Sequence, residues 1–361
     1  MPEALKNQFF TKGSIQKFAN EICKEYASFD NEKFLELIYT KDWETKELKA
    51  KMYHVTNCLH DTFSKDYLSA LEILLKIAPF IKGFEAMVLP DFVEQYGLDF
   101  WDESLAALKE FTKYSSSEFA IRPFIIANVE KSMSFMLKMA TDSHENVRRF
   151  ASEGCRPRLP WAMALPNLKK DPSLIFPILE KLKNDESEFV RRSVANNLND
   201  ISKDNPDMVL NLCEKWIGNT KNTDWIVKHA CRSLLKEGNS KAMRIFGFGD
   251  PKEIEVKGLK TDSSKVKIGT DLQFEFQLIN QSVNDAKIRL EYRVYFMKAN
   301  GKQSGKIFQI SEKLYKPGEY TIKKKHSFKN LSTRKHYTGD HGIGIVVNGV
   351  EKGNVVFQVS E

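Results

Sequence analysis

A repeat in the middle of the chain constrains its fold more than any other feature. Residues 142–149, with the sequence DSHENVRR, resemble residues 185–192, with the sequence DESEFVRR, at an offset of 43 residues (185 − 142). Weaker copies occur at residues 118–122 and 224–229. Periods near 40 residues are typical of HEAT-like helical pairs, which cannot bury their apolar faces alone and therefore stack. The repeat thus predicts a mainly α fold, a HEAT-like helical-repeat solenoid.

The remainder of the helical part carries apolar residues at helical spacing. Leu105, Leu108 and Phe111, for example, follow one another at intervals of three residues and predict one buried face. This pattern extends over residues 1–247, which we expect to form one domain. Glycine and proline residues then mark a linker at residues 248–255.

Residues 256–361 alternate between apolar and polar positions, as strands do. Clear examples are residues 272–278, with the sequence LQFEFQL, and residues 288–296, with the sequence IRLEYRVYF. Turn residues separate such runs. About seven short strands in a segment of this length predict an all-β immunoglobulin-like sandwich. No cysteine follows Cys231, so the disulfide of antibody domains is absent.

The composition limits the class of protein. Hydrophobic residues make up 42% of the 361 residues, which is ordinary for globular proteins, and the formal net charge of +7 is only mildly basic. The best apolar run, residues 70–81, is interrupted by Lys76 and Pro79, which argues against a membrane span. No signal-peptide pattern opens the chain, so we expect a cytoplasmic location.

The cysteines and short motifs predict no metal and no cofactor. The five cysteines are dispersed without a CxxC pair, which indicates reduced, buried thiols rather than disulfides or a zinc site. HExxH, Walker and GxGxxG motifs are all missing from the sequence.

Residues 148–161, with the sequence RRFASEGCRPRLPW, combine four arginines, one glutamate and one tryptophan at a predicted helix end. Arginine at this density indicates a polyanionic partner, because guanidinium groups bind phosphates in bidentate fashion. Binding alone does not explain why Glu153 stands among these cations. An acid within a phosphate-binding surface is therefore the main clue to function.

Helical spacing predicts a polar wall. Arg149, Glu153 and Arg156 are separated by four and three residues, so they share one face of their helix. The 43-residue offset places a second stripe on the matching face of the next repeat, namely Arg192, Asn196 and Asp200. These side chains can bind phosphate and sugar oxygens. The alternative is that the arginines form salt bridges with neighbouring acidic residues.

Two further residues have open alternatives. Trp161 follows two prolines in a predicted loop, where it is either a lid on the core or a stacking surface for a cation, worth about 0.5–2 kcal/mol. Glu118 either complements the dipole of a helix N-terminus or belongs to the polar wall.

Three segments of the chain resemble the AlkC branch of the AlkC/AlkD superfamily, bacterial DNA glycosylases built from HEAT-like repeats. They are residues 118–124 (EFAIRPF), residues 148–161 and residues 190–200 (VRRSVANNLND). The RPRLPW run is the most specific element. The resemblance covers the helical part, and the predicted β-sandwich resembles the Ig-like domain of the longer AlkC subgroup, where it helps to encircle DNA.

This resemblance implies a monofunctional DNA glycosylase of base excision repair. Its expected partner is double-stranded DNA with cationic alkylated bases, chiefly 3-methyladenine and 3-methylcytosine, and it is expected to act as a monomer, without a cofactor or membrane. The implied catalytic residues are Glu153, as the main carboxylate, Glu118 and Trp161. The expected DNA-binding residues are Arg148, Arg149, Arg156, Arg158, Arg192, Asn196 and Asp200. The alternative function is a non-catalytic HEAT-repeat scaffold that binds DNA or a protein.

Overall fold

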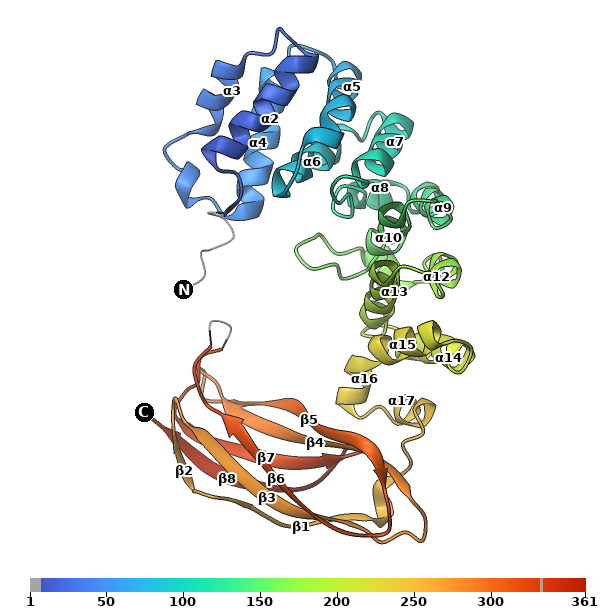
Figure 1. Cartoon of the computed structure of the whole chain (residues 1–361), viewed down its shortest axis with the longest axis vertical. Coiled ribbons are helices and arrows are strands. Elements are labelled where there is room, and N and C mark those ends of the chain that lie inside the picture. Colours follow the sequence, from blue (N-terminus) through green and yellow to red (C-terminus); the bar gives the residue numbers. More distant parts are fainter. Residues whose placement is uncertain (1–7, 332–333) are drawn as a thin grey trace. The chain divides into compact units, whose positions relative to one another are not determined.

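The computed structural model describes residues 8–331 and 334–361 (Figure 1). Its contacts divide the described residues into two compact units. The helical unit holds residues up to 212 together with residues 216–230, and the β unit holds residues 213–215 and 231–361.

The helical unit contains α-helices and short 3₁₀ turns along its whole length. The α-helices are α2 Lys12–Glu25, α3 Asn31–Ile38, α4 Leu48–Thr62, α5 Tyr67–Ile77, α6 Val88–Tyr96, α7 Trp101–Phe111, α8 Arg122–Ala127, α9 Val129–Met139, α10 Glu145–Glu153, α11 Pro166–Lys170, α12 Phe176–Leu182, α13 Glu188–Ile201, α14 Pro206–Trp216 and α15 Lys221–Ala230. The 3₁₀ turns are η1 Trp43–Thr45, η2 Ala78–Phe80 and η3 Phe84–Met87. Among the described residues, no helix has both the length and the apolarity needed to cross a bilayer.

Three helices that carry the repeat lie side by side. Helix α10 packs against α13, and α13 packs against α15, while α9 and α12 flank α10 (Figure 1). Val147 of α10 and Val190 of α13, the equivalent residues of the two clearest copies, are both fully buried. The predicted helices and their predicted apolar faces are therefore confirmed here.

The 43-residue repeat is also a repeat of hydrogen bonds. Nη1 of Arg148 donates to the carbonyl oxygens of residues 142 and 143, at 3.1 and 2.9 Å. Nη1 of Arg191 donates to the carbonyl oxygens of residues 185 and 186, at 2.6 and 2.8 Å. In each copy the first arginine thus satisfies carbonyl groups of the turn that precedes its own helix.

Arg148 also links one repeat to the next. Its Nε and Nη2 donate to the two carboxylate oxygens of Asp185 at 2.6 and 3.1 Å. Asp185 in turn accepts the backbone N–H of Ser187, the residue just before α13. The guanidinium of Arg148 is therefore occupied by protein groups in this structure, and its contact with DNA stays a prediction.

The β unit consists of two sheets, preceded by helices α16 Arg232–Glu237 and α17 Ser240–Ile245 and the turn η4 Pro251–Glu253. Its strands are β1 Ile254–Thr261, β2 Lys265–Lys267, β3 Asp271–Asn280, β4 Ala286–Met297, β5 Gln303–Tyr315, β6 Gly318–Ser327, β7 Gly339–Val347 and β8 Val350–Ser360. One sheet has the order β1-β3-β6 and the other β2-β8-β7-β4-β5. Among the strand pairs of the described residues, only β2–β8 is parallel. Both sheets contribute to one apolar core, for example through Phe276 of β3 and Val294 of β4.

Strand β4 departs from simple alternation. Arg289 and Glu291, which alternate with its core residues, are only 5% and 1% exposed and form an ion pair of 2.7 Å. The segment after α16 lies against this part of the sheet, since Lys287 donates to the carbonyl oxygen of Phe246 at 2.8 Å. The β unit thus includes residues from 231 onward that the sequence pattern assigned to the helical domain and linker.

We predict that Arg148→Met lowers the free energy of unfolding by about 2 kcal/mol, because it leaves the carboxylate of Asp185, only 6% exposed, without its cation. Denaturant titration measures the effect. The matched control is Arg192→Met, whose ion pair with Glu188 is about 60% exposed on both sides, and it should change stability by less than about 0.5 kcal/mol. Equal losses in the two variants would contradict the structural role of Arg148.

Candidate functional site

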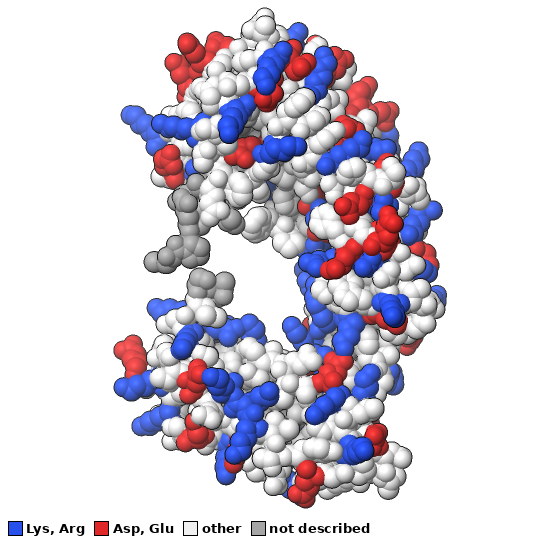
Figure 2. Space-filling view, viewed as in Figure 1, with Lys and Arg blue, Asp and Glu red and all other residues white. Residues whose placement is uncertain are grey.

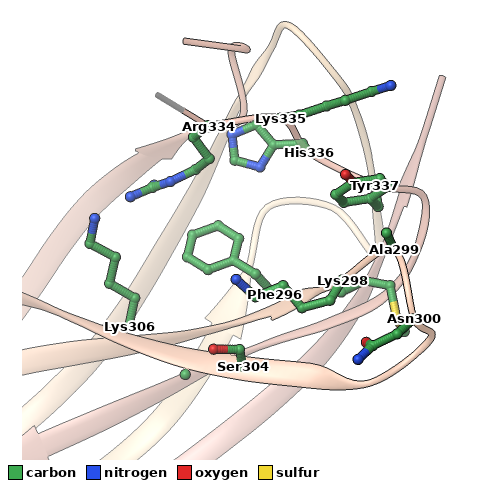
Figure 3. Close-up of a pocket in the computed structure, with 12 residues that line it drawn as sticks. Phe296, Lys298, Ala299, Asn300, Ser304, Lys306, Arg334, Lys335, His336 and Tyr337 are labelled. Carbon is green, nitrogen blue, oxygen red and sulfur yellow. The ribbon is translucent and has the colours of Figure 1, made fainter. Parts of the chain in front are cut away.

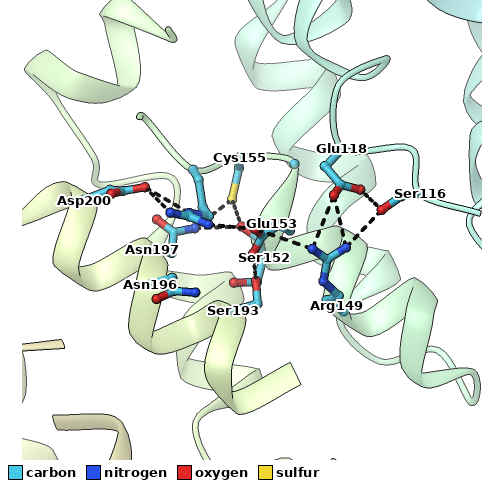
Figure 4. A network of polar contacts seen from close by, with 12 residues as sticks. Ser116, Glu118, Arg149, Ser152, Glu153, Cys155, Ser193, Asn196, Asn197 and Asp200 are labelled. Carbon is cyan, nitrogen blue, oxygen red and sulfur yellow. Dashed lines mark hydrogen bonds and ion pairs between the residues drawn. The ribbon is translucent and has the colours of Figure 1, made fainter. Parts of the chain in front are cut away.

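Glu153 lies at the centre of a buried polar network (Figure 4). It is the last residue of α10 and is 6% exposed. Its Oε1 accepts a hydrogen bond from Nη1 of Arg156 at 2.6 Å and lies 3.5 Å from Nη2 of Arg149. Its Oε2 accepts a hydrogen bond from the hydroxyl of Ser193 at 2.6 Å. Groups from α10, the turn after it and α13 therefore fix the orientation of this carboxylate.

Glu118 belongs to the same network. It lies in the turn before α8 and is 8% exposed. Both terminal nitrogens of Arg149 lie 3.3 Å from its Oε1, and Ser116 donates a hydrogen bond to its Oε2. Arg149 therefore stands between two carboxylates, and its guanidinium also lies 4.6 Å from the ring centroid of Phe189. The sequence leaves two alternatives for Glu118, a role at a helix N-terminus and a place in the polar wall. Its contact with Arg149 places it in the polar wall.

Arg156 extends the network to the second repeat. Its Nε and Nη2 lie 2.9 and 2.8 Å from Oδ2 of Asp200, near the end of α13. Burial acts to lower the pKa of Arg156, but the charges of Glu153 and Asp200 outweigh it and raise that pKa. The result is a line of alternating charges, ordered Glu118, Arg149, Glu153, Arg156 and Asp200.

A glycine permits close packing at the end of α10, just before Arg156. A Cβ on Gly154, directly after α10, would lie 2.7 Å from Cε of Met136 and 2.8 Å from Cγ2 of Ile121. Since real Cβ atoms do not approach so closely, only glycine allows the end of α10 to pack against α9 and the start of α8.

The predicted face of α10 is confirmed, because Arg149, Glu153 and Arg156 are in mutual contact. The predicted stripe on α13 is only partly joined to it. Asp200 contacts Arg156, whereas Asn196 forms a hydrogen bond of 3.1 Å with His229 of α15.

Two of the predicted arginines are exposed. Arg158 pairs with Asp204 at 2.6 Å and Arg192 pairs with Glu188 at 2.5 Å, with 38% and 60% of their side chains exposed. Exposed ion pairs contribute little free energy, about 0–1 kcal/mol, so these guanidiniums can exchange a carboxylate for a phosphate. Arg149 and Arg156 are held far more firmly, by buried carboxylates on two sides.

Trp161 lies on a loop outside the charged network. It is 70% exposed and adopts a left-handed backbone conformation, with φ of 66°. That conformation costs a residue other than glycine about 1–2 kcal/mol. Nζ of Lys49, on α4, donates to the carbonyl oxygen of Trp161 at 2.9 Å. The alternative of a lid on the core does not fit a ring that is so exposed.

Sequence reasoning missed several groups that hold the site in place. Ser193 carries no signal of its own, although the 43-residue offset aligns it with Phe150, a core residue of α10. Lys49 stands 112 residues before Trp161 in the chain, and no pattern links the two. Arg122 was seen only as part of a motif, yet its side chain is fully buried behind the loop.

The β unit holds a separate basic groove of about 940 Å³ beside the β4–β5 turn (Figure 3). It is lined by Phe296, Met297, Lys298, Ala299, Asn300, Ser304, Gly305, Lys306, Arg334, Lys335, His336 and Tyr337. These described lining residues include four cations and no acid. Partial burial and three neighbouring cations, Arg334 first among them, lower the pKa of Lys306 below its ordinary value.

Other Lys and Arg side chains form clusters on the visible faces of both units (Figure 2).

Known proteins match both parts of the chain. Residues 94–234 match the family model "DNA alkylation repair enzyme", and residues 255–361 match the C-terminal Ig-like domain of the uncharacterised protein YhaZ. The chain is 43% identical over 355 residues to "Uncharacterized protein YhaZ" of Bacillus subtilis (strain 168), covering 98% of both sequences. The predicted Ig-like domain is thereby confirmed.

A solved structure is similar to the whole chain. The alkylpurine DNA glycosylase AlkC of Pseudomonas fluorescens, bound to DNA containing an abasic site analog, matches with a TM-score of 0.94 and 35% sequence identity. The match covers 99% of this chain and 100% of that one.

The conformation of Trp161 yields a stability prediction. Trp161→Gly should be more stable than Trp161→Ala by about 1 kcal/mol, because glycine adopts the left-handed conformation without the steric penalty that alanine retains. Chemical denaturation of the two variants measures this difference. An alanine variant as stable as the glycine variant would mean that the backbone relaxes and stores no strain here.

Proposed function

This chain belongs to the AlkC family of DNA alkylation repair proteins, with a C-terminal Ig-like domain, and we propose that it is a monofunctional DNA glycosylase of base excision repair. It hydrolyses the N-glycosidic bond of cationic alkylated bases, 3-methyladenine and 3-methylcytosine, in double-stranded DNA. It acts as a cytoplasmic monomer, and its helical unit works as a HEAT-like solenoid. The observation that carries the proposal is the oriented, nearly buried carboxylate of Glu153 among arginines.

The chemistry of such lesions explains why a carboxylate is sufficient. Methylation at N3 gives the base a positive charge, so the bond from C1′ breaks with both electrons passing to a base that leaves neutral. No general acid is then required. Positive charge develops on the deoxyribose instead, and a nearby carboxylate stabilises it. Water adds its oxygen to C1′, loses a proton and leaves an abasic site, in a variation on glycoside hydrolysis that lacks the leaving-group acid.

The surroundings of Glu153 suit this electrostatic role. Arg156 and Ser193 hold its two oxygens by hydrogen bonds of 2.6 Å, so the carboxylate does not need to reorganise as charge develops. Its low exposure also keeps competing water away, which strengthens its interaction with a cation. We assign Glu153 as the main catalytic carboxylate and Glu118, which shares Arg149 with it, as the supporting one.

The remaining roles follow from exposure. Arg158 and Arg192 are the best placed to bind DNA phosphates, because their carboxylate partners are exposed. Trp161 presents an exposed ring that can contact the cationic sugar or lesion through its face. Arg149, Arg156 and Asp200 act on DNA chiefly through the network that they form with the two glutamates.

The competing hypothesis is a non-catalytic scaffold that binds DNA or a protein. Three carboxylates in the network oppose the approach of phosphate groups, and removing an ion pair from water costs several kcal/mol. A surface that only binds DNA gains nothing from that arrangement. The network therefore favours catalysis over binding alone.

We predict that Glu153→Gln lowers the rate of 3-methyladenine release from methylated DNA by at least about 100-fold, because glutamine keeps the size of the side chain but lacks the charge that stabilises the sugar cation. Single-turnover kinetics with excess enzyme measures the loss. Affinity for DNA with an abasic site analog should remain within about threefold of wild type.

The matched control is Glu145→Gln, the same chemical change on the exposed first turn of α10, which should excise at the wild-type rate. If Glu153→Gln also releases 3-methyladenine at nearly that rate, the assignment of the carboxylate is wrong. If wild-type protein releases no base above the buffer rate, the glycosylase proposal itself fails.

The basic groove of the β unit gives a second functional prediction. Lys306→Gln combined with Arg334→Gln should weaken DNA binding and reduce the slope of log affinity against log salt by about 1.8, since each phosphate contact contributes about 0.9. The ratio of 3-methyladenine to 3-methylcytosine excision should not change. Lys313→Gln combined with Lys324→Gln removes two exposed lysines outside the groove and serves as the control. An unaltered slope in the groove variant would argue against a DNA contact at this place.

A further inference from the structure

A buried cation lies behind the loop that carries Trp161. Arg122, the first residue of α8, is fully buried, and among the described residues no carboxylate forms an ion pair with it. Burial lowers its pKa to about 10. Its Nη2 has no hydrogen-bond partner among the described residues. Burying a guanidinium without a carboxylate partner costs free energy, so we expect this arginine to have a specific role through its hydrogen bonds.

The hydrogen bonds of Arg122 show what it holds. Nη1 donates to the carbonyl oxygens of Gly154 and Arg156, at 3.1 and 3.0 Å, and Nε donates to the carbonyl oxygen of Met163 at 2.6 Å. These acceptors lie at the two ends of residues 154–163, which we call the tryptophan loop. One rigid, planar group therefore ties the beginning of this loop to its end.

A second cation holds the tip of the tryptophan loop. Lys49 of α4 donates from Nζ to the carbonyl oxygen of Trp161, and the same Nζ lies 4.8 Å above the ring centroid of Phe119. Trp161 is the residue with the left-handed backbone. Lys49 thus binds the carbonyl group of the residue that has the strained backbone. The side chain of Lys49 is itself exposed.

From these contacts we propose that Arg122 and Lys49 are positioning residues, which hold the tryptophan loop in its DNA-contacting conformation before DNA arrives. Arg122 sets the ends of the loop from inside the helical unit, and Lys49 sets its tip from α4. An exposed indole on a free loop would lose conformational entropy on binding, whereas an indole on a preset loop has already lost it. The expected effect on base excision rests on the proposed function, whereas the expected ordering of the loop does not.

Two other roles for Lys49 make different predictions. If Lys49 binds a DNA phosphate, its removal reduces the slope of log affinity against log salt concentration by about 0.9. If Lys49 only positions the loop, its removal leaves that slope unchanged. If it only stabilises the fold, its removal lowers the thermal midpoint without any specific effect on the loop. Its exposure argues against a large effect on stability.

The first experiment tests the structural part without DNA. Hydrogen–deuterium exchange of wild-type protein is compared with Lys49→Met, in peptides that include Ala162 and Leu165, whose amides bond to carbonyls within the loop. We expect exchange in these peptides to be at least about fivefold faster in Lys49→Met, with α13 unchanged. Lys49→Arg, which keeps a cationic donor, should restore slow exchange, and Lys41→Met serves as the control for loss of an exposed lysine. Wild-type exchange in Lys49→Met would overturn the proposal.

The second experiment tests the catalytic part by a double-mutant cycle. Single-turnover excision of 3-methyladenine is measured for Lys49→Met, Trp161→Ala and the double variant. We expect about a tenfold loss for Lys49→Met, and no further loss when it is added to Trp161→Ala, because the lysine acts through the indole. Independent, multiplied losses would overturn the proposal, and so would wild-type excision by Trp161→Ala.

The outcomes separate this inference from the proposed function. If wild-type protein excises no base, the glycosylase proposal fails. The double-mutant cycle of Lys49 and Trp161 is then measured as affinity for DNA with an abasic site analog instead of as an excision rate. Arg122→Lys is measured in parallel with its thermal midpoint, because a change at a fully buried residue can unfold the protein. The exposed Lys49 variants keep the proposal testable whatever Arg122→Lys does.

Discussion

The packing of α10 against α13 is the interaction on which the candidate site depends. It brings Ser193 within 2.6 Å of Glu153 and lets Arg156 reach Asp200, so that one carboxylate is held from two repeats. Arg148 fastens the same two helices at their other ends through Asp185. Because both contacts join one copy of the repeat to the next, the geometry of the site follows from how the two copies pack together.

Charge burial is the cost of this arrangement. Glu118, Glu153, Arg156 and Asp200 are all less than one tenth exposed. Buried ion pairs of this kind are rarely more stable than well-packed apolar side chains, since desolvation offsets the attraction between the charges. Their presence is therefore better explained by preorganised electrostatics at the site than by stability. The strained backbone of Trp161, beside two cations that hold its loop, points in the same direction.

Much of the fold could be predicted, because it rests on local periodicity. Helical spacing predicted the shared face of Arg149, Glu153 and Arg156, and alternation predicted the core of β3. Alternation also predicted the apolar core face of β4, but it did not predict that Arg289 and Glu291 on the other face are buried. Periodicity describes one element at a time, and it carries no information about what covers the second face of a sheet.

The sequence by itself determined the two kinds of architecture and the clustering of arginines around one glutamate, because repeat period, alternation and residue spacing are properties of the chain. Only the tertiary structure decided which arginines are bound by carboxylates, that Glu118 shares Arg149 with Glu153, and that Lys49 reaches the carbonyl of Trp161. Those contacts join residues 31, 4 and 112 positions apart. Only the separation of four residues corresponds to one turn of a single α-helix. The other two contacts depend on how the helices pack together.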